Sequence, residues 1–242
     1  MGANTRAKVI SFGLKGNTNI SSKVLENDIS GLTLEINGHE MTSRLVGRFN
    51  AYNLLVAFAV GKYLGQDELS LLTILSSVKA PQGRFEYFLS DHKITAVIDY
   101  AHTPDALENV LKTLLDLKKG TEKLITVFGC GGNRDKGKRP LMGEIASRLS
   151  DQVLITSDNP RNEDPDSIIN EIYHGVPSVL KEKVFTVTDR MEAIEMACKM
   201  ASAGDVILIA GKGHENYQII GNESLHFDDM ENTIHIFKKL KK

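Results

Sequence analysis

The second half of the chain alternates short apolar runs with longer amphipathic stretches, and this alternation constrains the fold most. The apolar runs, each predicted to be a strand, are residues 93–101, 123–129, 152–157, 183–188 and 205–211. The stretch after the first run has Thr103 and Pro104 where a helix would begin and Gly120 where it would end. Strands that alternate with helices predict βαβ units and a parallel sheet covered on both faces. The predicted fold class is therefore α/β.

Polar residues and glycines follow four of the five predicted strands. The sequences found there are DYAHT, GCGGNRDKGKR, SDNPR and AGKGHE. The carboxyl ends of parallel strands lie along one edge of a sheet, and ligands bind beyond that edge. Because the strands themselves are apolar, the sequence predicts that the charged chemistry of this chain gathers at a single edge.

Residues 1–82 follow a different pattern. Short β-rich runs are separated by glycine and asparagine turns, which predicts antiparallel strands, and residues 50–65 read as an apolar helix. A region of about eighty residues is small for an independent hydrophobic core. We therefore expect it to be part of something larger, and we place the domains at 1–82 and 83–242.

Charge and hydropathy exclude several classes of protein. The chain has 29 Lys and Arg against 31 Asp and Glu, a net charge of −2, which argues against a nucleic-acid partner. No apolar run is long enough to span a membrane, and the opening residues, MGANTRAKVISFG, lack the apolar core of a signal peptide. Cys130 and Cys198 have neither a CxxC pattern nor metal-ligand spacing. A cytoplasmic protein with no metal site of its own is expected.

The stretch GNRDKGKR, residues 132–139, comes close to a phosphate-binding P-loop. It fails at the last position, where Arg139 replaces the hydroxyl residue that would hold magnesium, so we reject that assignment. Glycines with four basic side chains still suit an anion. The simpler interpretation is a flexible, solvated turn.

The stretch TSDNPRNEDP, residues 156–165, runs from an apolar strand into Asp-Asn-Pro-Arg. Asn-Pro favours a turn. A guanidinium fixed beside a rigid turn can bind a carboxylate through two parallel hydrogen bonds. Arg161 is thus a candidate to bind a carboxylate group of a ligand.

The remaining motifs each have a structural interpretation. Asp99 in DYAH could bond the backbone as a strand cap, and His102 could be an ordinary surface histidine. Asn50 in GRFNAYN could be a helix N-cap, and Arg84 in GRFEYF could be an exposed side chain at a domain junction. His214 in GKGHE has no second His or Cys at metal-ligand spacing, so a polar turn is the simpler interpretation.

Taken together and in order, GRFNAYN, APQGRFE, DYAHTPDALENVL, GCGGNRDKGKRP, TSDNPR and AGKGHE resemble the Mur ligases over essentially the whole chain. The resemblance implies the end of a central, P-loop-type ATPase domain with antiparallel strands and helices, followed by a complete Rossmann-like C-terminal domain with a mostly parallel sheet. The family's UDP-binding domain, its GTNGKT-like P-loop and its magnesium-holding modified lysine are not in this sequence.

The resemblance also implies a reaction and a site. The branch of the family marked by DNPR uses ATP and Mg²⁺ to join meso-diaminopimelate to UDP-N-acetylmuramoyl-L-alanyl-D-glutamate through an acyl phosphate, a step in peptidoglycan synthesis. The implied diaminopimelate-binding residues are Arg134, Asp158, Asn159, Pro160, Arg161, Gly211 and Glu215. The implied ATP-binding residues are Asn50, Asn53, Arg84, Asp99 and His102. The implied partners include the missing segments of the same ligase.

Four alternatives stay open. A lysine-adding ligase is disfavoured by Arg161, because lysine lacks the distal carboxylate that this arginine would bind. A folylpolyglutamate synthetase is disfavoured by DNPR and GKGHE. A non-catalytic remnant that binds amino acid or nucleotide fits the missing P-loop. A Rossmann oxidoreductase would rest on the fold alone, since no GxGxxG follows the first strand.

Overall fold

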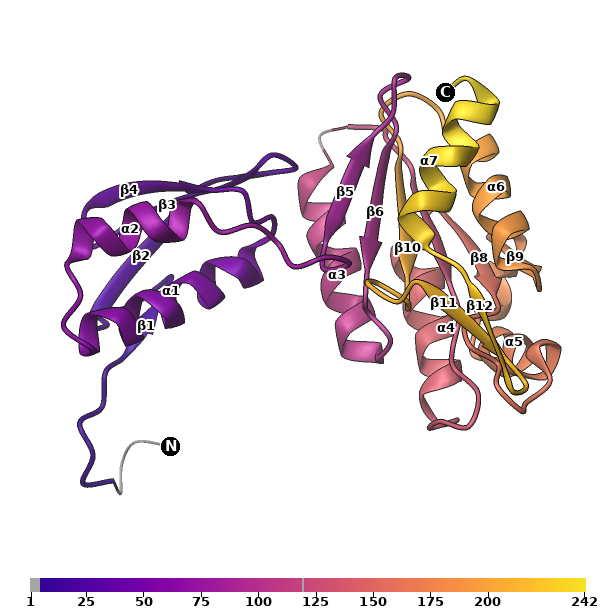
Figure 1. Cartoon of the computed structure of the whole chain (residues 1–242), viewed down its shortest axis with the longest axis horizontal. Helices are drawn as coiled ribbons and strands as arrows, with labels where there is room; N and C mark the ends of the chain where they lie inside the picture. The colour runs from indigo at the N-terminus through magenta and orange to yellow at the C-terminus, as the bar shows by residue number, and fades with distance from the viewer. Residues whose placement is uncertain (1–4, 119) are drawn as a thin grey trace. The chain divides into compact units, whose positions relative to one another are not determined.

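The computed structural model describes residues 5–118 and 120–242, and it divides into two compact units. The first unit runs to Ala80 and the second from Pro81 to Lys242, close to the boundary that we placed at 82/83. The two units are coloured from indigo to magenta and from magenta to yellow in Figure 1. No helix in the described part of the chain is long and apolar enough to cross a membrane.

The first unit contains a four-stranded sheet whose strands lie in chain order. The strands are β1 (Phe12–Gly13), β2 (Ile20–Asp28), β3 (Gly31–Ile36) and β4 (His39–Ser43). The β2–β3 and β3–β4 pairs are antiparallel, as predicted, but β1 pairs with β2 in parallel. The antiparallel expectation is therefore wrong for β1. Its return loop is closed by a side chain, since Asn19 Oδ1 accepts from both the backbone and the hydroxyl of Ser11.

Helices α1 (Arg48–Tyr63) and α2 (Glu68–Ser76) pack on this sheet and bury Leu55 and Phe58 in its core. The expected N-cap role of Asn50 is wrong, because the cap residue is Gly47, with φ of 93°. Asn50 lies inside the first turn, where its Nδ2 donates to the Val46 carbonyl. A second apolar stripe on α1 is exposed and consists of Tyr52, Val56, Val60 and Tyr63.

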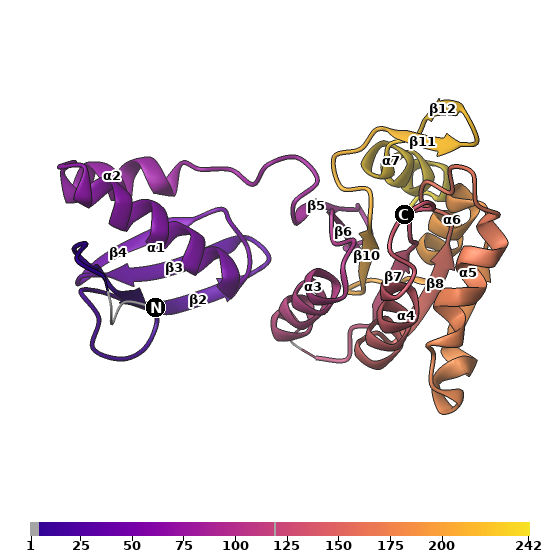
Figure 2. The same cartoon turned by 90° about the horizontal axis from the view of Figure 1, so that it is seen from below.

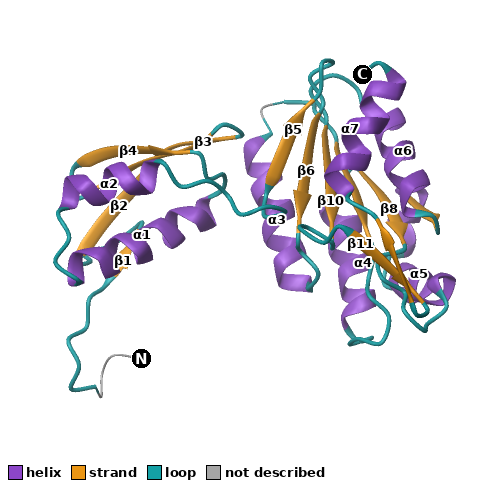
Figure 3. Cartoon of the chain, viewed as in Figure 1, coloured by secondary structure: helices purple, strands orange, loops and turns teal. Residues whose placement is uncertain are grey.

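The second unit is built on a mostly parallel sheet, drawn in orange in Figure 3. Its six strands are ordered β5-β6-β10-β7-β8-β9. The strands are β5 (Glu86–Leu89), β6 (Thr95–Asp99), β7 (Leu124–Phe128), β8 (Gln152–Thr156), β9 (Val184–Val187) and β10 (Val206–Ala210). All neighbours are parallel except β5, which pairs with β6 in the antiparallel direction. The predicted α/β class with a mostly parallel sheet is confirmed.

Helices cover both faces of this sheet, because its central strands are apolar on both sides. They are α3 (Pro104–Leu117), α4 (Lys138–Leu149), α5 (Pro165–His174), α6 (Arg190–Met200) and α7 (Asp229–Leu240), with a 3₁₀ turn at Ser178–Lys183. In Figure 2, α3 and α4 lie on one side of the sheet and α7 lies on the other. Helix α4 begins at Lys138, so Pro140 lies in its first turn.

A two-stranded hairpin, β11 (Tyr217–Ile220) and β12 (Glu223–His226), follows β10 and was not predicted. Its first strand runs beside the loop after β8, where Arg161 and Ile220 form a parallel bridge. The hairpin therefore ties together two loops that leave the sheet at the same edge.

Candidate functional site

The predicted polar edge contains a pocket of about 340 Å³ beyond the ends of β6, β7, β8 and β10. Seven residues that we predicted line it: His102, Arg134, Asp158, Asn159, Arg161, Gly211 and Glu215. Five others line it that were not among the site residues implied by the resemblance: Tyr100, Thr103, Gly131, Asp135 and Lys138. All five lie within or beside the motifs after the strands, so their position in the sequence was the signal available.

Arg161 is held in a defined position by the backbone of the hairpin. Its φ is 53°, in the left-handed region. Its N–H donates to the Ile219 carbonyl (3.0 Å), and its own carbonyl accepts from Gly221 (2.7 Å). Its Nη1 donates to the Gly132 carbonyl (2.9 Å). A Cβ on Gly131 would lie 2.9 Å from Nη1, so a side chain there would shift the guanidinium.

Asn159 is buried and connects the loop after β8 to the loop after β10. Its Nδ2 donates to Glu215 Oε2 (2.8 Å). Its Oδ1 accepts from Lys212 Nζ (3.0 Å) and from the Ile219 N–H (2.9 Å). All of its side-chain amide contacts are thus to residues 212–219, which fixes one wall of the pocket relative to the other loop.

Asp158 contributes a largely buried carboxylate to the lining of the pocket. It is 6% exposed, and its Oδ1 has no hydrogen-bond partner within the described residues. Lys212 Nζ lies 3.4 Å from that oxygen, close enough for an ion pair but without hydrogen-bond geometry. Gly211, with φ of 116°, leaves room beside the carboxylate, since a Cβ there would meet Asp158 Oδ2 at 2.9 Å. The cation nearest to the inaccessible Oδ1 is therefore the buried Lys212, and not a group in the pocket.

The basic loop after β7 differs from our expectation of four anion-binding side chains. Arg139 is buried and pairs with Glu163 and Glu171. Lys136 contacts the same two carboxylates. Of the four basic residues, only Arg134 and Lys138 line the pocket. The hydrogen bond from Arg139, with help from the Asn133 N–H, lowers the pKa of Glu163 to about 2.

The predicted ATP-binding residues of the second unit lie near one another around Tyr100. Asp99 accepts from the Phe85 and Ala101 N–H groups (2.8 Å each), so the strand-cap interpretation describes its contacts. Burial raises the pKa of Asp99 despite these bonds. The Arg84 guanidinium lies 4.6 Å from the centre of the Tyr100 ring, and His102 Nδ1 is 2.8 Å from the Tyr100 carbonyl oxygen.

Five predicted residues do not line this pocket: Arg84 and Asp99, described above, and Pro160, Asn50 and Asn53. Pro160 is a backbone contact, because its carbonyl packs so closely on Gly132 that a Cβ there would lie 1.9 Å away. Asn50 and Asn53 belong to the first unit, where Asn53 Nδ2 donates to Asn50 Oδ1 (3.0 Å). The ATP-binding role of the two asparagines stays a prediction.

A buried ion pair contacts the strand ends next to the pocket, and the sequence analysis did not predict it. Arg190 and Asp229 are both fully buried and share two hydrogen bonds of 2.8 Å. Arg190 also donates to the carbonyls of Ser157 and Ala210. Each of these residues directly precedes one that lines the pocket, so the pair fixes two strand ends.

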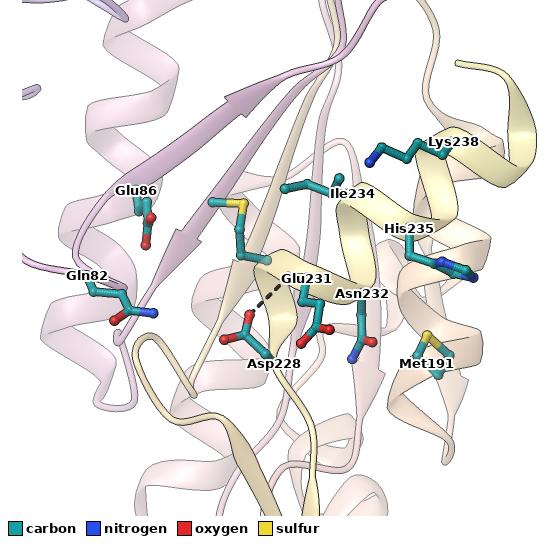
Figure 4. Close-up of a pocket in the computed structure, with 10 residues that line it drawn as sticks. Gln82, Glu86, Met191, Asp228, Glu231, Asn232, Ile234, His235 and Lys238 are labelled. Atoms are coloured by element: carbon teal, nitrogen blue, oxygen red, sulfur yellow. Dashed lines mark hydrogen bonds between the residues drawn. The ribbon is translucent and has the colours of Figure 1, made fainter.

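A second hollow of about 790 Å³ lies between β5 and α7 and shares no residue with the predicted site. Figure 4 shows Gln82 and Glu86 facing the start of α7. Asp228, Glu231 and Lys238 supply the charged groups around this hollow.

Among the described residues, no group of three or more His, Cys, Asp or Glu could hold a metal ion. Burial raises the pKa of both cysteine thiols to about 12, so neither is a nucleophile at neutral pH.

Residues 83–213 match the family model described as Mur ligase, glutamate ligase domain. The model covers more than half of the chain, and the pocket lies at the sheet edge that the strand pattern predicted. The chain belongs to the Mur ligase family.

Two similar proteins carry the same name, UDP-N-acetylmuramoyl-L-alanyl-D-glutamate–2,6-diaminopimelate ligase. The one from Cytophaga hutchinsonii is 50% identical over 226 residues, which are 93% of this chain and 46% of that protein. A solved structure of that name is 36% identical, with a TM-score of 0.70, over 97% of this chain and 48% of the other. The chain spans about half the length of the curated relatives it matches.

A folylpolyglutamate synthase from Mycobacterium tuberculosis, solved with ADP and AMPPCP, matches at 22% identity and a TM-score of 0.60. The match covers 78% of this chain and 45% of the synthase chain. At this level of identity the likeness shows a shared fold alone.

Proposed function

We propose that this chain supplies the amino-acid site of an ATP-dependent ligase that adds meso-diaminopimelate to UDP-N-acetylmuramoyl-L-alanyl-D-glutamate. The names of the similar proteins support this substrate pair. ATP, Mg²⁺ and the UDP-linked dipeptide are proposed for the whole ligase, whose relatives are about twice as long as this chain. The cytoplasmic location stays a prediction.

The observation that carries the proposal is the mixture of charges in one pocket. Arg134 and Arg161 supply guanidinium groups, and Asp158 and Glu215 supply carboxylates. Diaminopimelate has an amino-carboxylate group at each end, so both kinds of charge find a partner. Lysine has no carboxylate at its distal end and would leave Arg161 without one. This difference favours the diaminopimelate-adding branch over the lysine-adding one.

The chemistry assigned to these residues is positioning. In the proposed reaction the dipeptide carboxyl is first converted to an acyl phosphate by ATP. The free amine of diaminopimelate then attacks it, a C–N bond forms, the C–O bond to phosphate breaks, and the amine loses its proton. An amine held as an ammonium ion cannot attack. Glu215 and the Gly211 backbone would hold the distal ammonium, and Arg161 the distal carboxylate, so that the other amine reacts.

Calorimetric titration of the chain with meso-diaminopimelate and with L-lysine tests the proposal. The chain should bind the first and not the second. Arg161→Ala should weaken diaminopimelate binding by about 1.5–3 kcal/mol, roughly tenfold to a hundredfold, because it removes charge-assisted hydrogen bonds at a half-buried site. Arg148→Ala is the matched control, since Arg148 is exposed on α4 and pairs with Glu144. Equal binding of both ligands, or an unaffected Arg161→Ala, would refute the proposal.

A further inference from the structure

Lys212, within the GKGHE motif, is fully buried although it stands in a polar loop. Its Nζ donates to the Tyr217 carbonyl (2.6 Å) and to Asn159 Oδ1 (3.0 Å), and it lies 3.4 Å from Asp158 Oδ1. It does not line the pocket. An ammonium without water is costly unless such partners surround it, so a lysine here calls for a specific reason.

The position of Lys212 determines which way the Asn159 amide points. The oxygen and nitrogen of an asparagine side chain have nearly the same shape, so the neighbours decide the orientation. Two donors, Lys212 Nζ and the Ile219 N–H, converge on one atom, which must be the oxygen. The nitrogen then faces Glu215 Oε2. The reverse orientation would place an NH₂ group against an ammonium and leave the Glu215 carboxylate facing a carbonyl oxygen.

We propose that Lys212 is a positioning residue for the amino-acid site: its buried ammonium holds Asn159 Oδ1, which turns Nδ2 toward Glu215 and fixes that carboxylate in the pocket. The inference rests on the proposed function for the identity of the ligand. The orientation of Asn159 is a property of the chain without ligand.

Burial lowers the pKa of Lys212, and the nearby carboxylates of Asp158, Asp229 and Glu215 oppose that shift. Asp158 and Glu215 place two carboxylates in one pocket, and Arg161 Nη1 is already bonded to backbone carbonyls. Lys212 lies behind these carboxylates and offsets their repulsion without competing for the ligand, because it is covered by the loop and the hairpin. It therefore helps to hold the acidic groups in place without itself lining the pocket.

The test combines Lys212→Met with Asn159→Ala in a double-mutant cycle on diaminopimelate affinity, measured by calorimetry on the full chain. Each single variant should weaken binding at least tenfold. The double variant should bind diaminopimelate no more than about threefold more weakly than whichever single variant binds it less tightly. Both changes break the same hydrogen-bond linkage, so their effects should not add. Lys112→Met is the control, since Lys112 is a surface lysine paired with Glu108 on α3. Wild-type affinity in Lys212→Met, or effects that multiply, would overturn the proposal.

Hydrogen exchange at the Ile219 amide gives a readout that needs no ligand. This N–H donates to Asn159 Oδ1, so Lys212→Met should speed its exchange at least tenfold relative to amides in β7. If the wild-type chain binds no diaminopimelate, the proposed function fails while this measurement still judges Lys212. Unchanged exchange would overturn its role. Lys212→Gln keeps a donor but removes the charge, and it replaces the methionine variant in both experiments if the latter does not fold.

Discussion

Removing Asp229 should destabilise the second unit more than any surface substitution, because it leaves Arg190 as an uncompensated buried charge. Both side chains are fully buried, and two hydrogen bonds of 2.8 Å join them. Burial alone would lower the pKa of Arg190, but attraction to Asp229 outweighs it and the pKa is raised. The native state thus depends on this carboxylate to keep the guanidinium in place.

The magnitude follows from the geometry. Losing one partner of a buried ion pair costs about 3–5 kcal/mol. The two carbonyls that Arg190 also contacts, on Ser157 and Ala210, would lose their alignment as the guanidinium relaxes. Glu108→Ala removes an exposed pair on α3 and should cost only about 0.3–0.5 kcal/mol. We therefore predict that Asp229→Ala lowers the stability of the second unit far more than Glu108→Ala does.

The assay must report on the second unit alone, because the chain has two compact units and no tryptophan. Native-state hydrogen exchange of the β10 amides does this, since β10 lies between β6 and β7 at the centre of the sheet. A loss below about 1 kcal/mol in Asp229→Ala would refute the reasoning. It would mean that Arg190 reaches solvent or another carboxylate when Asp229 is removed.

Two further substitutions test the local geometry. Gly83→Ala should destabilise the second unit by more than Gly221→Ala. Both glycines have positive φ, which costs an alanine about 1–2 kcal/mol. A Cβ at Gly83 would also lie 2.0 Å from the backbone nitrogen of His214, whereas Gly221 faces open space. Equal melting temperatures for the two variants would contradict this. Glu163→Gln should lower the melting temperature at neutral pH, and its difference from the wild type should shrink as the pH falls from about 4.5 toward 2. The pKa of Glu163 is depressed to about 2, so its stabilisation is present above its ordinary pKa of 4.5 and is lost as the carboxylate is protonated. A difference that stays constant with pH would exclude the ion pair with Arg139 as the cause.

The sequence predicted the parallel strands and the polar edge because both depend on local patterns. Each of β6, β7, β8, β9 and β10 lies inside its predicted range. Strand β5 was missed, since its four residues alternate between half-buried and exposed and form only an edge. The hairpin was also missed, because its strands are largely exposed and show no apolar periodicity.

The contacts that shape the site could not be predicted, because they join residues far apart in the sequence. Lys138 and Lys212 each follow a glycine in a polar loop at the same edge of the sheet. Lys138 stays half-buried at the pocket and donates to the His102 carbonyl, whereas Lys212 is fully covered and reaches Asn159. Nothing in either motif distinguishes the two. What distinguishes them is the hairpin, whose Tyr217 carbonyl accepts from Lys212. The role of a lysine is thus decided by an element that the pattern of apolar residues does not reveal.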